Sequence, residues 1–230
     1  MGLTLTYLGH SGFLLDDGRT TVAIDPFLSG NPLAPFPWDQ VRCDAMVLTH
    51  GHPDHITDAE AIAKANDAVV FGAWEIHEYL SEREIRTEPM NHGGRVSAEW
   101  GWVAFTQAVH SSSFQGRYMG AACGAIVHLG GVNVYHCGDT DLFSDMKLIA
   151  EIYQPEIAMI PIGDRFTMGA ALASRAAEWI KPKVAIPIHY RTFPLLAQDA
   201  SGFEPKGVTV KVLEPGERWS FGSGPRAATV

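Results

Sequence analysis

Residues 48–65 read LTHGHPDHITDAEAIAKA and place three histidines and one aspartate within six positions. These four residues are His50, His52, Asp54 and His55. An apolar run, AMVLT, stops just before them, and a helical pattern begins just after them. A strand that ends at this point delivers the side chains to a loop at a sheet edge. There they can converge on one place instead of alternating between two faces.

Converging imidazole nitrogens and carboxylate oxygens are typical of a transition-metal site. Zinc, manganese, iron and nickel accept such mixed ligands, whereas calcium and magnesium call for oxygen ligands throughout. A polar surface turn is the alternative interpretation, but three histidines and an aspartate in so compact a pattern favour the metal. Thr57 and Asp58 are better placed than Asp54 to cap the helix that follows.

Short strand-like runs alternate with helical stretches along the whole chain. The strand candidates are residues 3–8, 12–15, 21–24, 45–49, 68–71, 102–109, 124–129, 132–137, 156–162, 183–188 and 208–213. The helix candidates are residues 58–66, 74–82, 141–153 and 168–180, the last with Thr167 as its N-cap. Each half runs from strands to helices, which predicts a mixed α/β (α+β) fold of two packed sheets with helices outside. We expect one domain over residues 1–230, with the Pro-rich residues 29–40 as a surface loop.

Composition excludes several classes of protein. The chain has 230 residues, is 46% hydrophobic and carries a net charge of −9 without any basic run, so a broad nucleic-acid interface is not expected. The first residues lack a secretory pattern, and no apolar run is long enough to span a membrane. We therefore expect a cytoplasmic protein without a membrane partner. Cys43, Cys123 and Cys137 lack CxxC spacing and are expected to be small buried residues.

The motif and the segments after it resemble the metallo-β-lactamase fold hydrolases. HGHPDH resembles their His-x-His-x-Asp-His motif, and three further matches follow in the family's order, each at the end of a strand-like run. These matches are His110 in FTQAVHSSS, Asp139 in VYHCGDTDLF and His189 in AIPIHYRTF. The stretches YLGHSGF, PIGDRFTMG and HYRTFPLL are similar to a UPF0173-like branch of metal-dependent hydrolases related to ascorbate-phosphate lactonases.

This resemblance implies a four-layer αβ/βα sandwich with two metal ions at one edge, most simply zinc. The first metal would be held by His50, His52 and His110, the second by Asp54, His55 and His189, and Asp139 would bridge them. Two such ions can share a water, lower its pKa and polarise the bond under attack. We therefore expect a dinuclear hydrolase that uses a metal-bridging hydroxide, aimed by the catalytic Asp54, on a small ester, lactone or phosphoester. A nucleotide or lipid phosphodiesterase and a non-catalytic metal-binding regulatory protein are the alternatives.

Departures from neighbouring patterns narrow the expected reaction. Flavodiiron oxidoreductases of this fold carry Glu at the position of His52, so histidine favours hydrolysis over redox chemistry. The best-known β-lactamases use Cys at the position of Asp139, which argues against antibiotic cleavage. Nucleases of the fold share the ligands, but this chain has no basic arm to hold RNA. Pro53 replaces the small residue common in the related branch, which affects the path of the loop.

Four further residues are candidates for contacts with the substrate or with the metal ligands. His10 follows the first strand, and the resemblance implies a place near the metal edge, either holding a ligand in position or contacting substrate; a structural histidine with satisfied hydrogen bonds is the alternative. Ser111 follows His110, and Tyr190 and Arg191 follow His189. A guanidinium beside two cations implies an anion between them, such as a substrate phosphate or carboxylate, or else an ion pair with a nearby acid.

Overall fold

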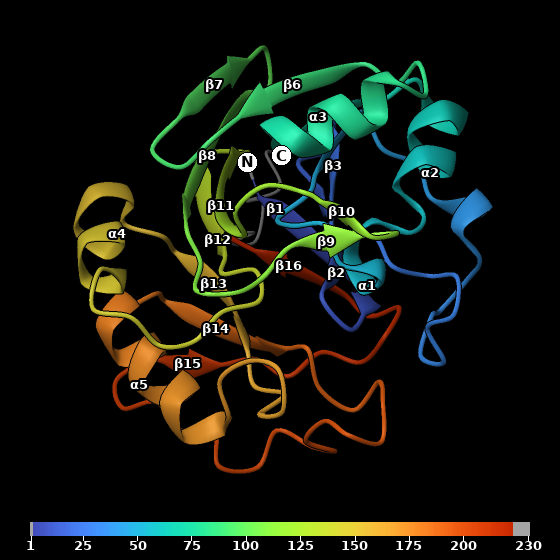
Figure 1. Ribbon diagram of the computed structural model, residues 1–230. Helices are drawn as coiled ribbons and strands as arrows, with labels where there is room; N and C mark the ends of the chain where they lie inside the picture. Colours follow the sequence, from blue (N-terminus) through green and yellow to red (C-terminus); the bar gives the residue numbers. More distant parts are fainter. Residues whose placement is uncertain (1, 223–230) are drawn as a thin grey trace, which may run out of the picture.

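Two seven-stranded sheets pack face to face, and helices cover their outer surfaces (Figure 1). The structure is a computed structural model and describes residues 2–222. In the first sheet the strands, in spatial order, are β16 (Arg218–Phe221), β1 (Leu3–Gly9), β2 (Gly12–Asp16), β3 (Thr21–Ile24), β4 (Ala45–Val47), β5 (Val69–Ala73) and β6 (Thr87–Met90). In the second they are β15 (Thr209–Val210), β14 (Val184–Ile188), β13 (Ile157–Pro161), β12 (Val132–His136), β11 (Cys123–Leu129), β8 (Gly101–Gln107) and β7 (Arg95–Ala98).

The helices and a small hairpin complete the fold. The helices are α1 (Pro53–Ile56), α2 (Ala59–Asn66), α3 (Trp74–Ser81), α4 (Met146–Tyr153) and α5 (Ala170–Ile180), with a short 3-10 turn, η1, at Trp38–Gln40. The hairpin pairs β9 (Ser113–Phe114) with β10 (Arg117–Tyr118). Among residues 2–222, no helix combines the length and the apolar composition that a bilayer crossing requires.

Both sheets follow the same plan of pairing. In the first, β1, β2 and β3 are antiparallel, whereas β3, β4, β5 and β6 are parallel. In the second, β8, β11 and β12 are antiparallel, whereas β12, β13, β14 and β15 are parallel. Parallel strands end at the same edge of a sheet, so the loops that follow them are brought together there.

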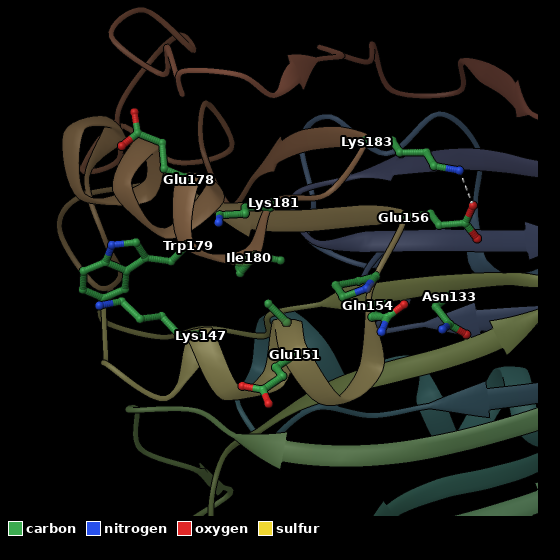
Figure 2. Close-up of a pocket in the computed structure, with 12 residues that line it drawn as sticks. Asn133, Lys147, Glu151, Gln154, Glu156, Glu178, Trp179, Ile180, Lys181 and Lys183 are labelled. Atoms are coloured by element: carbon green, nitrogen blue, oxygen red, sulfur yellow. Dashed lines mark hydrogen bonds and ion pairs between the residues drawn. The ribbon is translucent and has the colours of Figure 1, made fainter.

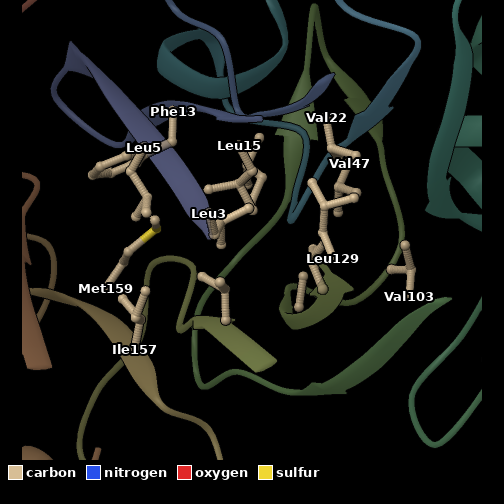
Figure 3. Close-up of a cluster of buried hydrophobic side chains, with 14 of the residues drawn as sticks. Leu3, Leu5, Phe13, Leu15, Val22, Val47, Val103, Leu129, Ile157 and Met159 are labelled. Atoms are coloured by element: carbon tan, nitrogen blue, oxygen red, sulfur yellow. The ribbon is translucent and has the colours of Figure 1, made fainter. Parts of the chain in front are cut away.

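The main core lies between the two sheets. Leu5 and Phe13 of the first sheet face Ile157 and Met159 of the second, and all four side chains are buried (Figure 3). Each such side chain contributes roughly 1.5–3 kcal/mol through burial. Because the outward side chains of each sheet are also apolar, the helices must cover them.

Each outer face has its own helix layer. On the first sheet, Ile62 of α2 and Ile76 of α3 pack into the cluster that contains Met46 of β4. On the second, Ala173 and Ala177 of α5 present small side chains to β13, which lets the helix approach the sheet closely. The layers are therefore helix, sheet, sheet and helix, which confirms the predicted sandwich.

Two helix starts differ from the sequence prediction. The third predicted helix begins at Met146 instead of residue 141, because Asp141 and Asp145 bond neighbouring groups of the loop. The fourth begins at Ala170 with Gly169 as N-cap, so the prediction of a Thr167 cap was wrong. The Thr167 hydroxyl instead donates to the carbonyl of Met168.

Three edge strands were not predicted. β6, β7 and β16 are four residues long each, and their sequences TEPM, RVSA and RWSF lack an apolar run. Charged residues and proline are usual at sheet edges, where they prevent pairing with another chain. Conversely, only residues 209–210 of the predicted strand 208–213 form a strand.

A surface cleft of about 950 Å³ lies between α4 and α5, at the starts of β12, β13 and β14 (Figure 2). Lys183 in its lining pairs with Glu156 at 2.8 Å, and Lys147 lies over the Trp179 ring. Its lining contains no histidine. The residues with metal-binding chemistry follow the other ends of the same strands, so this cleft is separate from the site described next.

Candidate metal centre

The sequence-predicted ligands come together at the edge where the parallel strands end. The motif follows β4, His110 follows β8, Asp139 follows β12 and His189 follows β14. Loops of both sheets therefore contribute to the same place, although the residues are up to 139 positions apart, from His50 to His189.

The motif itself folds differently from the predicted loop. Pro53–Ile56 forms the one-turn helix α1, with Pro53 in its first turn. Proline suits this position because its fixed φ matches the helix and its missing N–H would have no partner there. Pro53 therefore sets the backbone path and turns Asp54 and His55 in the direction of the other ligands. Asp58 does not cap α2 with its side chain; it accepts the backbone N–H groups of Leu28 and Ser29 instead.

Gly51 allows the motif to pack tightly against Met119, which follows the β9–β10 hairpin. A Cβ at this position would lie 2.3 Å from Cβ of Met119, far inside contact distance. The backbone N–H of Gly51 also donates to the buried Ser112 hydroxyl at 3.1 Å. Ser112 follows His110 by two residues, so this bond holds the loops of two ligand groups together.

Three histidines form the first cluster. Nδ1 of His52 lies 3.0 Å from Nε2 of His50 and 3.2 Å from Nε2 of His110. Burial lowers the pKa of each of these histidines, so their rings are neutral at pH 7 and offer lone pairs. Three neutral nitrogens within 4.8 Å of one another can hold one metal ion.

The second cluster combines a carboxylate with histidines. Ligand atoms of Asp54, His55, His189 and also His10 lie within 4.8 Å of one another. Oδ2 of Asp54 is 3.6 Å from Nε2 of His189. Burial would raise the pKa of Asp54, but hydrogen bonds from His10 and His189 lower it well below its ordinary value. Asp54 is therefore ionised.

Asp139 lies between the two clusters. Its Oδ2 is 3.6 Å from Nε2 of His110 and 2.9 Å from Nε2 of His189, and its Oδ1 is 3.4 Å from Nε2 of His55. Nε2 of His50 is 3.9 Å from Oδ2. A carboxylate has lone pairs on both oxygens and can therefore serve two cations at once.

The buried carboxylates create a demand for positive charge. Burial alone lowers the pKa of His189, but Asp139 and Asp54 outweigh it and raise the pKa to about 9. Burial likewise opposes charge on His55, yet Asp139 and Asp25 raise its pKa well above the ordinary value. Without a metal, protons on these two rings therefore supply the charge that the carboxylates require.

The same region holds polar atoms without partners. Nε2 of His55, Oδ1 of Asp139 and Nδ1 of His189 are buried and make no hydrogen bond within residues 2–222. A buried unpartnered polar atom costs roughly 1–3 kcal/mol. Nε2 of His55, which belongs to the second cluster, faces Oδ1 of Asp139 at 3.4 Å. A cation near both atoms would satisfy them, so the residues fit a metal.

Comparison with known proteins agrees with this geometry. A family model described as the β-lactamase superfamily domain matches residues 4–189. A UPF0173 metal-dependent hydrolase of Thermus thermophilus is 46% identical over 216 residues, 92% of this chain and 96% of that protein. A relative of the same name from Carboxydothermus hydrogenoformans is 44% identical over 222 residues, 94% of this chain and 98% of that protein. The chain belongs to the UPF0173 metal-dependent hydrolases of the metallo-β-lactamase superfamily.

The solved structures show the same fold. Igni18, a metallo hydrolase from the archaeon Ignicoccus hospitalis, superposes with a TM-score of 0.89 at 35% identity and covers 97% of this chain and 100% of its own. Figure 1 shows the two sheets and flanking helices that define the metallo-β-lactamase fold. The resemblance seen in the sequence is therefore confirmed at the level of family and fold.

In this UPF0173 member, sequence analysis missed the residue that orients His55. Asp25 is fully buried, and its Oδ2 accepts Nδ1–H of His55 at 2.7 Å. The Thr49 backbone N–H donates to Oδ1 at 2.8 Å, and the Thr49 hydroxyl donates to Oδ2 at 2.5 Å. These bonds direct Nε2 of His55 to Asp139. A lone aspartate at the end of the predicted strand 21–24 was the only signal, and such residues are common in turns.

The four additional candidates have different surroundings. His10 is fully buried, and its Nε2 lies 2.9 Å from Oδ2 of Asp54, beside the second cluster. The Ser111 hydroxyl is exposed and lies 3.2 Å from Nε2 of His52. Tyr190 is buried in the hydrophobic cluster under α4 and α5. Arg191 makes two bonds, of 3.1 and 2.8 Å, to the carboxylate of Glu214, which is the ion-pair alternative.

Proposed function

We propose that this UPF0173 member is a dinuclear metal-dependent hydrolase that cleaves a small, uncharged carboxylic ester or lactone. His50, His52 and His110 would hold one ion, and Asp54, His55 and His189 the other, with Asp139 between them. Zinc is the simplest ion for three neutral imidazoles, and manganese, iron and nickel fit the same nitrogen and oxygen ligands.

The position of Asp139 is the observation that carries this proposal. One carboxylate faces histidines of both clusters at 2.9 to 3.9 Å, and such a shared acceptor suits a pair of ions. Two ions in such a pair, when bound, lower the pKa of a shared water and polarise the bond under attack. A regulatory protein that binds one structural metal has no need for the second cluster, so turnover is favoured over a purely binding role.

Asp54 is the residue that would aim the attack. Its Oδ2 is held by His10, and its side chain is partly exposed, at 25%, whereas that of Asp139 is 2% exposed. The ionised carboxylate can therefore accept a hydrogen bond from a water at the open side of the site and orient it. A carboxylate in this place would act as an acceptor and positioning group through its charge and its lone pairs.

The charges of the neighbouring segments favour an uncharged substrate over a phosphoester. Arg191 is engaged by Glu214, and Arg117 by Glu82. Residues 26–37 carry no charge at all, and the loop 163–169 offers only Arg165, beside Asp164. Phe166 and Leu195, in loops next to the site, are 55% and 61% exposed. Phosphate recognition usually relies on unpaired Arg guanidinium or Lys ammonium groups, so this composition suits a neutral ester or lactone with an apolar group.

The test begins with the metal. Protein stripped with a chelator and reloaded with zinc should bind about two ions per chain, measured by elemental analysis after desalting. Asp139→Ala should bind fewer ions per chain and lose activity. His128→Gln should keep both the bound ions and the activity, because His128 lies on β11 and bonds Asn133. Binding of a single ion by the wild type, or no transition metal at all, would overturn the dinuclear assignment.

The substrate class is tested by comparing three compounds of different chemistry. A neutral aryl ester, a γ-lactone and an anionic aryl phosphodiester would be compared at saturating metal through kcat/KM. We expect the ester and lactone to exceed the phosphodiester by at least about tenfold, about 1.4 kcal/mol in transition-state binding. A preference for the phosphodiester would instead support the phosphodiesterase alternative.

A further inference from the structure

His10 connects Asp54 to Thr192, which lies in the loop that follows β14 of the second sheet. The turn between β1 and β2 carries His10, and its ring is fully buried. Nε2 of the ring lies 2.9 Å from Oδ2 of Asp54, and Nδ1 lies 2.9 Å from the hydroxyl of Thr192. Thr192 is itself buried and follows His189 by three residues. Both ring nitrogens of His10 therefore have a partner at hydrogen-bond distance.

The proton positions in this chain follow from the chemistry of its ends. An ionised carboxylate can only accept, so Nε2 of His10 must carry the hydrogen. A neutral imidazole then has its lone pair on Nδ1, and the Thr192 hydroxyl must donate to it. The Thr192 hydroxyl has one other acceptor, the carbonyl of Tyr190 at 3.2 Å. The contact with Nδ1 is shorter, at 2.9 Å, and Nδ1 carries no hydrogen in this tautomer, so the hydroxyl hydrogen is directed mainly to His10.

The backbone keeps His10 in place independently of Asp54. Its φ is +56°, a left-handed conformation that non-glycine residues rarely adopt. Its carbonyl accepts two hydrogen bonds, from the Tyr7 hydroxyl at 2.9 Å and from the His189 backbone N–H at 2.8 Å. The ring packs against the His189 ring at 4.2 Å between centroids. His10 is therefore a fixed donor to which the Asp54 carboxylate adjusts.

We propose that Thr192 and His10 form a positioning pair for Asp54, in which Thr192 stabilises the His10 tautomer that Asp54 requires and His10 fixes the orientation of the Asp54 carboxylate. This inference rests on the proposed metal centre and concerns the second ion, the one that Asp54 would bind. In this proposal His10 is a hydrogen-bond donor and not a ligand, although its nitrogen lies within the second cluster. The first cluster of His50, His52 and His110 should not depend on the pair.

Variants can separate the effect of losing the Thr192 hydroxyl from the effect of disturbing the fold. Thr192→Val keeps the shape and removes the donor, and Thr192→Ser restores the hydroxyl. His10→Ala removes both bonds, whereas His10→Gln keeps an N–H that can reach Asp54. Thr106→Val is the matched control, because Thr106 is a buried β8 threonine that pairs with Tyr135 away from the site.

Zinc affinity is the first measurement, made by competition with a chelator at pH 7.5. Partners of metal ligands typically change affinity by about 10- to 100-fold. We expect Thr192→Val and His10→Ala to weaken the second ion by about tenfold or more, with the first ion within about threefold of wild type. Thr192→Ser, His10→Gln and Thr106→Val should bind the second ion within about threefold to fivefold of wild type. The proposal would be overturned if Thr192→Val and His10→Ala bound the second ion as tightly as the wild type does.

The His10 tautomer is the second measurement, read from the ring ¹H–¹⁵N correlations of wild-type and Thr192→Val protein. The wild type should show hydrogen on Nε2 with and without zinc, and Thr192→Val should show a mixture. Hydrogen on Nδ1 together with zinc-shifted Nε2 would make His10 a ligand and overturn the proposal. The metal-free spectrum tests the positioning pair even if the wild type fails to bind two ions. Failure of the proposed function can therefore be distinguished from failure of the positioning pair.

Discussion

Asp25→Asn should selectively weaken the second metal ion. The two oxygens of Asp25 accept from different donors, because Oδ1 takes the Thr49 backbone N–H and Oδ2 takes Nδ1–H of His55. An asparagine has one oxygen and one NH₂ group, so one of these donors must face another donor. The backbone N–H cannot change, whereas His55 can move its hydrogen to Nε2. That tautomer points a hydrogen at the place where a metal would bind.

The expected magnitude follows from the bond that is lost. A hydrogen bond to a charged group is worth about 1.5–3 kcal/mol, which corresponds to about 10- to 100-fold in affinity. Zinc competition should therefore show the second ion weakened by that factor, with the ion at His50, His52 and His110 unchanged. Thermal unfolding would verify that the variant is folded.

Asp58→Asn provides the matched control for this prediction. Asp58 is also a buried aspartate, but a single oxygen, Oδ2, accepts both the Leu28 and the Ser29 backbone N–H groups, at 2.7 and 2.8 Å. An asparagine oxygen can accept the same two bonds, so metal affinity should be preserved. The reasoning is refuted if Asp25→Asn binds both ions as tightly as Asp58→Asn does, or if it loses both ions to the same extent.

Three further predictions follow from the site. Asp54→Asn, assayed on the best substrate at saturating metal, should lower kcat by about 10² or more, an effect of roughly 3 kcal/mol, while KM changes little; a loss of only a few-fold would leave Asp54 without a catalytic role. Gly51→Ala should destabilise the protein by about 1–3 kcal/mol in urea unfolding, because its Cβ would collide with Met119, and unchanged stability would mean that the loop can shift freely. The metal-free protein should lose stability as pH rises from about 6.5 through about 9, because the raised pKa of His189 means that the folded state holds a proton that the unfolded chain releases first. The difference between the pKa of His189 in the folded and in the unfolded chain corresponds to about 3 kcal/mol in the free energy of unfolding. Zinc affinity should rise over the same pH range, because zinc must displace that proton. Denaturation and zinc titrations at pH 6.5, 8 and 9.5 would show both trends, and flat profiles would contradict them.

Local patterns were sufficient to predict the sheets and helices with long apolar runs. The strands around Ile126 and Ile186 are buried on both faces and read as continuous apolar sequence, so their positions were visible. β16 was not, because RWSF is a four-residue edge strand that gains its stability from pairing with β1. The order of strands within each sheet is likewise a long-range property that local periodicity does not contain.

The candidate site shows the same division. His50, His52 and His55 share a motif, and His110, Asp139 and His189 could be matched through the resemblance. Asp25 and Thr192 could not be predicted, because their roles depend on contacts across 30 residues with His55 and 182 residues with His10. An aspartate after one strand and a threonine in a loop are ordinary residues until the fold brings them to a histidine ring.

The backbone at this edge indicates why the site is rigid. His10, Asp25 and His189 all have φ between +42° and +58°, where non-glycine residues lose roughly 1–2 kcal/mol each. Such a conformation persists only where surrounding contacts determine it. The His189 backbone N–H donates to the His10 carbonyl at 2.8 Å, and thereby joins a loop of the second sheet to one of the first.

This link matters because neither sheet holds a complete set of candidate ligands. The first cluster takes His50 and His52 from the first sheet and His110 from the second, and the other cluster draws on both sheets in the same way. The distance between the clusters therefore depends on how the two sheets pack through the core between them. The left-handed backbone of His10 and His189 and the hydrogen bond from His189 to His10 join the two sheets at this edge. The contacts that hold this backbone in its left-handed conformation therefore also hold the candidate ligands of the two sheets close to one another.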